Sequence, residues 1–488
     1  MLVEPLLNAS SRTPNKLAAT DPNRELTYKQ LTAFAAALRA MVLEQTDCPR
    51  VGVILPSLGS CMALFYGIWW AGRTVVPLNF LAPAPELAAI IDDAGIDLLI
   101  TIEPFADPLA SLSIRKIYLE QMGLKRKTLA ALVRRWPALP ENAPDETAVI
   151  LYTSGTTGRP KGVCLSFDNL RSNAEAGIEH MRLSPEHQFL GVIPSFHVYG
   201  LSTTILCPVL VGATTHFLPR FQPLTVINTI HERRITVVVL IASMYQALTR
   251  TKQPGDRLAS VELAISGGEP LPPAAARAFT EKFGVPLLEG YGMTETSPFV
   301  SVNRPTANKP GTAGQLLSGV EVRIVDDNSQ DVSVGAEGEI LVRGPGVMRG
   351  YYNQPAETAK AVDEAGWLWT GDIGTLDDNG YLSITGRKKE MIIVGGENVY
   401  PREVEDILTL HDDVAEAAVI GVPDASRGEV VAAVVVPVAD RQPDEIALRD
   451  FCRKRLAGFK VPRQVRVGSD LPRGPTGKIL KRKLHELF

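Results

Sequence analysis

Short apolar runs that alternate with longer segments of helical period constrain the fold of this chain most strongly. The runs are bounded by turn residues and are too short to be typical helices. They lie at residues 51–55, 148–152, 236–241, 261–266 and 285–288. Segments with the apolar spacing of a helix, such as 26–43 and 274–283, lie between them. This alternation predicts an α/β fold with largely buried strands.

The pattern of apolar and turn residues changes in two later regions. From Gly319 onward, the runs GVEVRIVD and GEILVRG are separated by Gly, Asp and Asn, which predicts an antiparallel, β-rich subdomain. After Gly386, strand-like runs alternate with helical segments at 402–410 and 444–456, which predicts a small α+β domain with its own core. A chain of 488 residues exceeds what one core usually supports. We therefore expect a large domain at 1–386 and a smaller one at 387–488.

Composition excludes several classes of protein. A formal net charge of −4 gives no sign of a nucleic-acid partner. The five cysteines are scattered, as expected for reduced thiols in a cytoplasmic protein and unlike a zinc site or a disulfide framework. The N-terminus has no basic leader and the most apolar stretch, 61–70, is too short to span a bilayer, so we expect neither a signal peptide nor a transmembrane helix. Peripheral contact with a membrane remains open, since an apolar substrate could lead to it.

The strongest chemical signal is TSGTTGRPKG, which directly follows the apolar run AVILY. Its glycines let backbone amides approach an anion, its hydroxyls add donors, and Lys161 supplies positive charge, a combination that suits a nucleotide polyphosphate. It is not a Walker A loop, because Lys161 is followed by Gly162 and not by Ser or Thr. A plain polar turn is the alternative, but such turns are usually shorter. The candidate phosphate-binding residues are Thr153, Ser154, Gly155, Thr156, Thr157, Gly158 and Lys161.

This loop resembles the phosphate-loop signature of the adenylate-forming superfamily, which includes acyl-CoA synthetases, luciferases and adenylation domains of peptide synthetases. Further matches follow in the family's order. They are PSFHVYG (194–200), ISGGEPL (265–271), EGYGMTETSP (289–298), GYYNQP (350–355), WTGD (369–372), GRKKEMIIVGGENVYPREVE (386–405) and PTGKILKR (475–482). The chain looks closest to the fatty-acid–CoA ligases of the acyl-CoA synthetase branch.

The resemblance implies a nucleotide and metal site. Glu295 would bind Mg²⁺ and Thr294 the α-phosphate, which suits a carboxylate beside a hydroxyl. Asp372 and Arg387 correspond to the pair that binds the ribose, although a surface salt bridge is an alternative for Arg387. The segments expected around the adenine and its phosphates contribute Gly268, Glu269, Pro270, Glu289, Gly290, Tyr291 and Gly292.

Two further catalytic candidates come from the resemblance. Lys478 would neutralise carboxylate and phosphate oxygens as the mixed anhydride forms, and Lys481 to Lys483 are expected to form a solvated tail. His197, between aromatic neighbours, would lie at the carboxylate pocket, with a structural histidine as the alternative.

The reaction implied by the resemblance has two steps: an acid and ATP give an acyl-adenylate, and a thiol then displaces AMP. One site cannot hold Lys478 and the incoming thiol at the same carbonyl, which favours a small domain that rotates between the steps. The resemblance implies such a C-terminal domain, with Lys389 at the family's hinge position. Gly395 and Gly396 would then border the pantetheine of coenzyme A, and Arg463 would meet its nucleotide end.

We therefore expect an AMP-forming acyl-CoA synthetase that uses ATP, Mg²⁺ and coenzyme A. The segments around the acyl site are apolar or small, which favours a hydrophobic monocarboxylic acid such as a medium- or long-chain fatty acid, and Gly267 and Gly268 would leave room for its chain. Aryl acids such as cinnamates remain an alternative substrate. A separate carrier protein is the alternative acceptor, and a catalytically silent nucleotide binder is the rival from another class.

Overall fold

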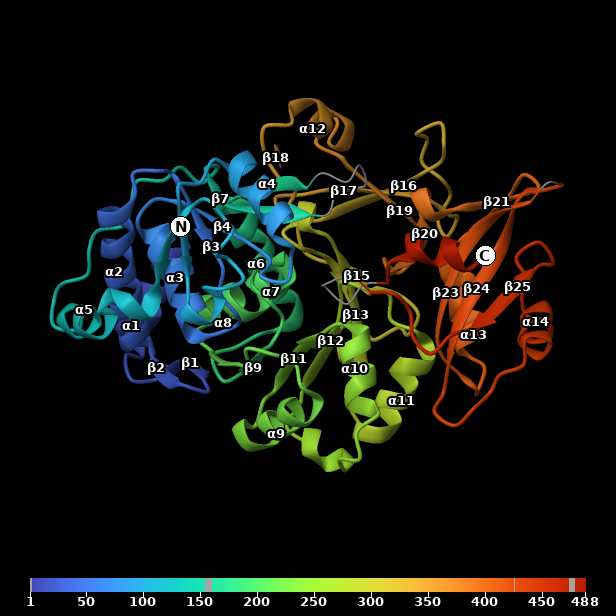
Figure 1. Ribbon diagram of the computed structural model, residues 1–488, viewed down its shortest axis with the longest axis horizontal. Helices are drawn as coiled ribbons and strands as arrows, with labels where there is room; N and C mark the ends of the chain where they lie inside the picture. Colours follow the sequence, from blue (N-terminus) through green and yellow to red (C-terminus); the bar gives the residue numbers. More distant parts are fainter. Residues whose placement is uncertain (1, 154–159, 425, 474–478) are drawn as a thin grey trace.

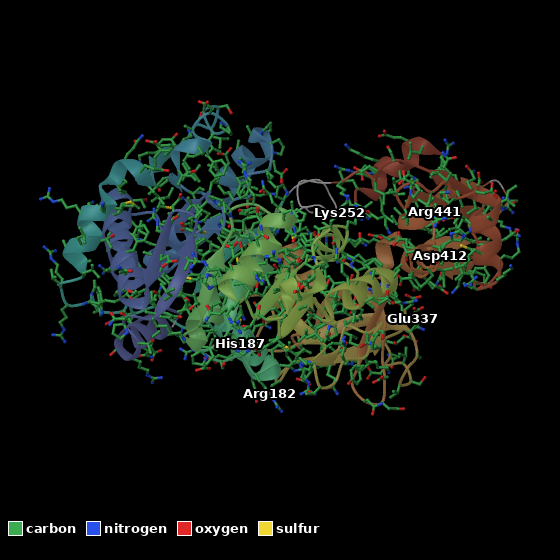
Figure 2. The ribbon with its side chains drawn as sticks, turned by 90° about the horizontal axis from the view of Figure 1, so that it is seen from below. Arg182, His187, Lys252, Glu337, Asp412 and Arg441 are labelled. Atoms are coloured by element: carbon green, nitrogen blue, oxygen red, sulfur yellow. The ribbon has the colours of Figure 1, made fainter. Side chains whose placement is uncertain are left out.

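The computed structural model describes residues 2–153, 160–424, 426–473 and 479–488. We call residues 1–386 the large part and residues 387–488 the C-terminal part. Figure 1 shows the C-terminal part at one end of the molecule, beside helices α10 and α11. Figure 2, seen from below, has Asp412 and Arg441 on that part, whereas Arg182 and His187 lie on the large part.

Two sheets form the centre of the large part. Within the described residues the first has nine strands in the order β15-β14-β13-β12-β11-β9-β10-β1-β2. In this order the successive pairs from β13 to β1 are parallel, and β1 and β2 form an antiparallel hairpin. Its strands are β1 (Leu17–Asp21), β2 (Arg24–Thr27), β9 (Gln188–Gly191), β10 (Thr214–Phe217), β11 (Val237–Leu240), β12 (Leu263–Ser266), β13 (Leu287–Gly292), β14 (Phe299–Val302) and β15 (Gln315–Leu316).

The second sheet carries the glycine-rich loop. Its described strands run in the order β18-β8-β7-β4-β3-β5-β6, with parallel pairing from β7 to β6 and antiparallel pairing among β7, β8 and β18. They are β3 (Arg50–Val53), β4 (Thr74–Pro77), β5 (Leu98–Thr101), β6 (Arg115–Tyr118), β7 (Thr147–Thr153), β8 (Lys161–Ser166) and β18 (Gly350–Tyr351).

Helices cover these sheets, and α3 is buried over its whole length, including Trp69 and Trp70. Capping boxes start α2, through Thr27 and Gln30, and α6, through Ser166 and Asn169. The helices of the large part are α1 (Val3–Arg12), α2 (Tyr28–Gln45), α3 (Gly59–Trp70), α4 (Ala84–Ala94), α5 (Leu124–Ala131), α6 (Phe167–Met181), α7 (Val198–Gly200), α8 (Cys207–Val211), α9 (Pro223–Arg233), α10 (Ala242–Thr249), α11 (Pro273–Phe283) and α12 (Pro355–Ala361). None of the helices in the described chain is both long and apolar enough to cross a membrane.

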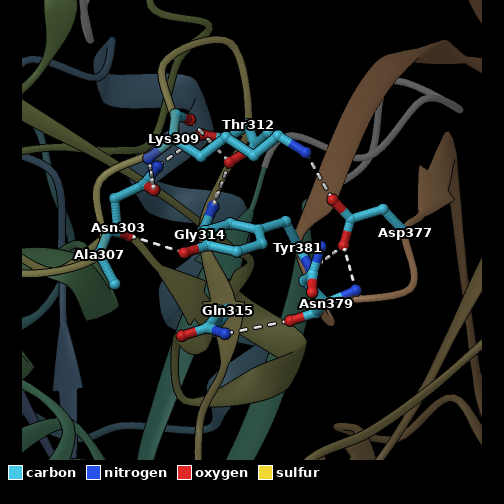
Figure 3. A network of polar contacts seen from close by, with 9 residues as sticks. All are labelled: Asn303, Ala307, Lys309, Thr312, Gly314, Gln315, Asp377, Asn379 and Tyr381. Atoms are coloured by element: carbon cyan, nitrogen blue, oxygen red, sulfur yellow. Dashed lines mark hydrogen bonds and ion pairs between the residues drawn. The ribbon is translucent and has the colours of Figure 1, made fainter.

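An antiparallel sheet follows, as the sequence predicts. Its strands are β16 (Glu321–Val325), β17 (Gly338–Arg343), β19 (Leu368–Leu376) and β20 (Leu382–Arg387). A polar network in Figure 3 ties the segment between β14 and β15 to the β19–β20 turn: Lys309 Nζ lies 2.6 Å from Asp377 Oδ2, and the Tyr381 hydroxyl donates to the Ala307 carbonyl at 3.1 Å. Because β14 pairs with β13, this network links β19 to β13, and both strands carry candidate residues of the site below.

The C-terminal part has a sheet of its own. The strands are β21 (Ile392–Val394), β22 (Glu397–Val399), β23 (Val414–Asp424), β24 (Gly428–Pro437) and β25 (Gln464–Val467), and the helices are α13 (Pro401–Thr409) and α14 (Glu445–Arg453). Two clusters of buried apolar side chains in it contain only residues from Ile392 onward. The predicted fold class, a large α/β part with a β-rich subdomain and a small α+β part, is confirmed. The boundary at 386/387 stays a proposal.

Candidate active site

The glycine-rich segment joins two paired strands. β7 and β8 form an antiparallel hairpin in which Thr153 lies opposite Lys161. Ser154, Gly155, Thr156, Thr157 and Gly158 lie outside the described residues, so Thr153 and Lys161 are the members of the predicted phosphate loop whose positions are described. Both stand at the loop end of the hairpin, one on each side of the connecting segment.

Lys161 is held by an acidic and an aromatic partner. Its Nζ lies 2.6 Å from Glu357 Oε2 on α12 and 4.9 Å from the ring centroid of Tyr351 on β18. Hydrogen bonds from Lys161 and Lys360 lower the pKa of Glu357 from 4.5 to about 2. The Lys161 side chain is 19% exposed, so a phosphate could reach it and replace the carboxylate, since both anions form charge-assisted hydrogen bonds.

Glu295 lies in a 3₁₀ turn (Thr294–Thr296) just after β13, and it is buried. Its Oε1 accepts a hydrogen bond of 2.9 Å from the Tyr351 hydroxyl, and Thr294 precedes it in the same turn. No group of three or more His, Cys, Asp or Glu side chains that could hold a metal ion exists among the described residues. A single buried carboxylate fits Mg²⁺, which commonly takes one or two carboxylates and completes its shell with phosphate oxygens and water.

Asp372 and Arg387 face each other across β19 and β20. Arg387 Nε lies 2.7 Å from Asp372 Oδ1, and the Tyr291 hydroxyl donates to Asp372 Oδ2 at 2.6 Å. Asp372 is almost fully buried. The structure thus brings Tyr291, from the segment expected around the adenine, into contact with the predicted ribose pair.

The remaining predicted nucleotide residues gather at the carboxyl ends of two parallel strands. The register pairs Ser266 of β12 with Glu289 of β13, so the segment after Ser266 begins beside Glu289. Glu269 Oε1 accepts from the Ser243 amide at 2.5 Å. Ligands of α/β sheets bind at such carboxyl ends. Gly268, Pro270, Gly290 and Gly292 belong to the same two segments.

The structure limits the space at the expected acyl end of the site. His197 immediately precedes α7, with its ring centroid 4.6 Å from that of Phe196. A Cβ added to Gly267 would lie 3.1 Å from the Tyr199 ring, and one on Gly268 would lie 4.0 Å from it. The Tyr199 ring therefore packs closely against Gly267, and the expectation that the two glycines leave room for a chain stays a prediction.

The C-terminal candidates lie apart from these residues. Gly395 and Gly396 form the exposed turn between β21 and β22, and a Cβ on either would meet nothing within 4 Å. Figure 1 shows β21 on the far side of the C-terminal part from β13. Arg463 Nη1 lies 3.4 Å from Asp424 Oδ2, and Lys389 lies in a 3₁₀ turn (Lys388–Glu390) after β20. Lys478 lies outside the described residues.

Sequence reasoning missed several contacts of the site. Tyr351, Glu357 and Arg402 were not singled out, although Tyr351 and Arg402 fall within matched motifs. Arg402 Nη2, on α13, lies 3.0 Å from Glu289 Oε1 and so links the C-terminal part to the nucleotide segments. Lys481 was expected in a solvated tail. Its Nζ instead lies 2.8 Å from Glu390 Oε2 and 2.9 Å from Glu405 Oε1, and so forms two ion pairs.

Comparison with known proteins identifies the family. The model of the AMP-binding enzyme family matches residues 6–352, and that of the AMP-binding enzyme C-terminal domain matches residues 403–478. The chain belongs to the AMP-binding enzyme family. The resemblance to adenylate-forming enzymes drawn from the motifs is thereby confirmed.

Curated relatives of this AMP-binding enzyme match over nearly the whole chain. A long-chain-fatty-acid–CoA ligase of Bacillus subtilis is 34% identical, with 99% of this chain and 93% of the relative covered. An indoleacetate–CoA ligase of Aromatoleum aromaticum is 36% identical, with 97% and 95% covered. A feruloyl-CoA synthase of Amycolatopsis is 35% identical, with 98% and 96% covered. The relatives thus act on chemically different acids.

A solved structure agrees with the whole arrangement. ATP-bound MatB from Rhodopseudomonas palustris is 31% identical, covers 100% of this chain and 99% of its own, and superposes with a TM-score of 0.91. The apo form of MatB, with 100% and 98% covered at the same identity, gives a TM-score of 0.84. The arrangement of the AMP-binding enzyme described here therefore matches the ATP-bound form more closely.

Proposed function

We propose that this enzyme joins a hydrophobic monocarboxylic acid to coenzyme A through an acyl-adenylate. The contact that carries the proposal is the one between Tyr351 and Glu295, because it joins the hairpin that holds the glycine-rich loop to the carboxylate suited to Mg²⁺. The enzyme is an AMP-forming acid–CoA ligase that uses ATP, Mg²⁺ and coenzyme A, as its family and the names of its relatives support.

The described residues would hold the nucleotide at both ends. Asp372 accepts one contact on each carboxylate oxygen, from Tyr291 and Arg387, and each oxygen keeps a lone pair for a ribose hydroxyl. Lys161 would exchange Glu357 for a phosphate oxygen, and Thr153 would donate from the opposite strand. A magnesium ion at Glu295 would neutralise charge that develops on the phosphates.

The chemistry proceeds as two displacements. A carboxylate oxygen of the acid attacks the α-phosphorus of ATP, and pyrophosphate leaves. The thiolate of coenzyme A then attacks the acyl carbonyl, and AMP leaves with the former carboxylate oxygen. We assign charge neutralisation in the first step to Lys478, contact with the acid carboxylate to His197, and the hinge between the steps to Lys389, with Gly395, Gly396 and Arg463 on the coenzyme.

The acid is proposed as a medium- or long-chain fatty acid, because the segments around His197 and Gly267 are apolar or small. An aryl acid is the second candidate. It is favoured by the Tyr199 ring, which packs against Gly267 and would offer an aromatic face to a flat substrate. Free coenzyme A is the proposed acceptor, with a carrier protein as the alternative.

The test is pyrophosphate release with acetate, hexanoate, laurate, palmitate, benzoate and 4-coumarate, each with and without coenzyme A. We expect acid-dependent release and the matching acyl-CoA, with laurate or palmitate preferred if the acid is a fatty acid and 4-coumarate if it is aryl. Lys478→Ala should abolish release, whereas Lys483→Ala, at an exposed lysine in the same segment, should not. Adenylate that accumulates without thioester would favour a carrier protein, and no release with any acid would contradict the proposal.

A further inference from the structure

One buried ion pair joins the C-terminal part directly to the nucleotide segments. Arg402 Nη2 lies 3.0 Å from Glu289 Oε1, and the two side chains are only 16% and 10% exposed. Glu289 is on β13, two residues before Tyr291, which contacts the ribose candidate Asp372. We propose that Arg402 is a positioning residue for adenylation: through Glu289 it holds the C-terminal part at the nucleotide site for that half-reaction and not for thiol transfer.

Interactions within helix α13 do not account for the position of Arg402. It is the second residue of α13, where the positive end of the helix dipole disfavours a cation. Asp406, one turn later, lies 3.7 Å from Arg402 Nε, an i,i+4 contact that steers the guanidinium. The residue therefore gains its main partner outside the helix, in Glu289.

Glu289 depends on this partner. Burial raises the pKa of the Glu289 carboxyl, and the charge of Arg402 opposes that rise. Besides Arg402, the Leu271 amide donates to the same oxygen, at the long distance of 3.4 Å. A buried carboxylate that loses its cation is strongly disfavoured. Departure of Arg402 would therefore destabilise Glu289 and the β13 segment that carries it.

The contact is specific to one arrangement of the two parts. Val394, Val399 and Val404 belong to one apolar cluster, so the Gly395–Gly396 turn and α13 move as one unit. In the arrangement seen here that turn is exposed and turned away from β13, and Arg402 is at Glu289. A rotation that brought Gly395 and Gly396 to the site would carry Arg402 away from Glu289. The inference in this respect rests on the proposed two-step function.

The experiment measures the two half-reactions separately, in the full chain. Acid-dependent exchange of pyrophosphate with ATP reports adenylation, and thioester formation from preformed acyl-adenylate and coenzyme A reports thiol transfer. Arg402→Met should slow exchange about tenfold or more and leave thiol transfer unchanged or faster. The melting temperature should fall, because the buried Glu289 loses its cation, and unchanged thiol transfer would show that the slower exchange is not a loss of folded protein. Arg402→Lys should restore part of the exchange, because it returns the charge with poorer geometry.

Arg250→Met is the matched control. Arg250 Nη2 lies 3.3 Å from Glu416 Oε1 and also joins the two parts, but Arg250 is 59% exposed and Glu416 keeps Arg473 as a second partner. Arg250 lines a cleft of about 490 Å³ between the parts, and neither Glu289 nor Arg402 is among the lining residues of this cleft. We expect it to leave both half-reactions unchanged.

The outcomes separate this inference from the proposed function. Selective loss of exchange in Arg402→Met, with partial recovery in Arg402→Lys, supports it. Equal loss of both half-reactions, no loss of either, or the same split in Arg250→Met would overturn it while the proposed function stands. A wild-type protein that performs neither half-reaction with any acid would overturn both.

Discussion

At the scale of single residues, the site works through side chains that hold other side chains in place. Tyr351 donates to Glu295 and lies beneath Lys161, whose other partner is Glu357. The candidate metal ligand and the candidate phosphate cation are thus preorganised by one aromatic side chain. Preorganised charge is a large source of catalysis because it need not rearrange during the reaction.

Tyr351→Phe tests the first contact. Loss of the hydrogen bond to the Glu295 carboxylate should raise the Mg²⁺ concentration for half-maximal activity by roughly tenfold, the equivalent of about 1.4 kcal/mol. The measurement is a magnesium titration of pyrophosphate release. Tyr352→Phe, at the neighbouring tyrosine whose ring packs on Arg50, is the control. An unchanged magnesium dependence in Tyr351→Phe would contradict the role of this hydroxyl.

Glu357 gives a prediction about pH. Because Lys161 and Lys360 lower its pKa from 4.5 to about 2, the carboxylate contributes to stability above pH 4.5, and that contribution is lost as the pH falls toward 2. In Glu357→Gln the wild-type-minus-variant difference in melting temperature should therefore shrink between these two pH values. A difference that stays constant over this range would show that the ion pair does not stabilise the fold.

At the scale of elements, the β7–β8 hairpin positions Lys161, and β18 completes it by bringing Tyr351 alongside. The three strands pack closely at Gly162, where an added Cβ would lie 2.8 Å from Ile150 Cγ2 and 3.2 Å from Tyr352 Cβ. β18 pairs with β8 through Gly350 and Tyr351. A side chain at Gly162 would therefore disturb the strands that hold both Lys161 and Tyr351.

Gly162→Ala should lower the free energy of unfolding by about 1–3 kcal/mol, the usual cost of overpacking, and should weaken ATP binding. Gly458→Ala is the matched control, because a Cβ there meets nothing within 4 Å. Denaturant unfolding and ATP titration of both variants provide the check. Equal stability of the two variants would contradict the close packing at Gly162.

The sequence predicted these elements unevenly. The runs at 51–55, 148–152 and 236–241 correspond to β3, β7 and β11, because buried parallel strands are continuous apolar runs. β18 could not be predicted, since two residues show no periodicity. The pair of Asp372 and Arg387 came from motifs, whereas the contact of Arg402 with Glu289 depends on how two distant segments pack. The close contact of Tyr199 with Gly267 likewise depends on tertiary packing, which the glycines alone do not reveal.

At the scale of the whole molecule, the account requires one site that serves two successive reactions. The candidate nucleotide residues come from both central sheets and from the four-stranded sheet, and the C-terminal part contacts them through Arg387 at its start and through Arg402 on α13. The candidate coenzyme residues Gly395 and Gly396 face away in the same arrangement. A molecule built in this way can form an adenylate before a thiol reaches it.

The most direct test of the central claim follows one oxygen atom. The enzyme is supplied with ATP, coenzyme A and an acid whose carboxylate carries oxygen-18. The mass of the AMP produced is then measured by mass spectrometry. An acyl-adenylate intermediate predicts AMP that contains one labelled oxygen, because the carboxylate oxygen that attacks phosphorus stays with AMP when the thiolate breaks the acyl–oxygen bond. Unlabelled AMP, or label found in pyrophosphate or phosphate, would contradict the account.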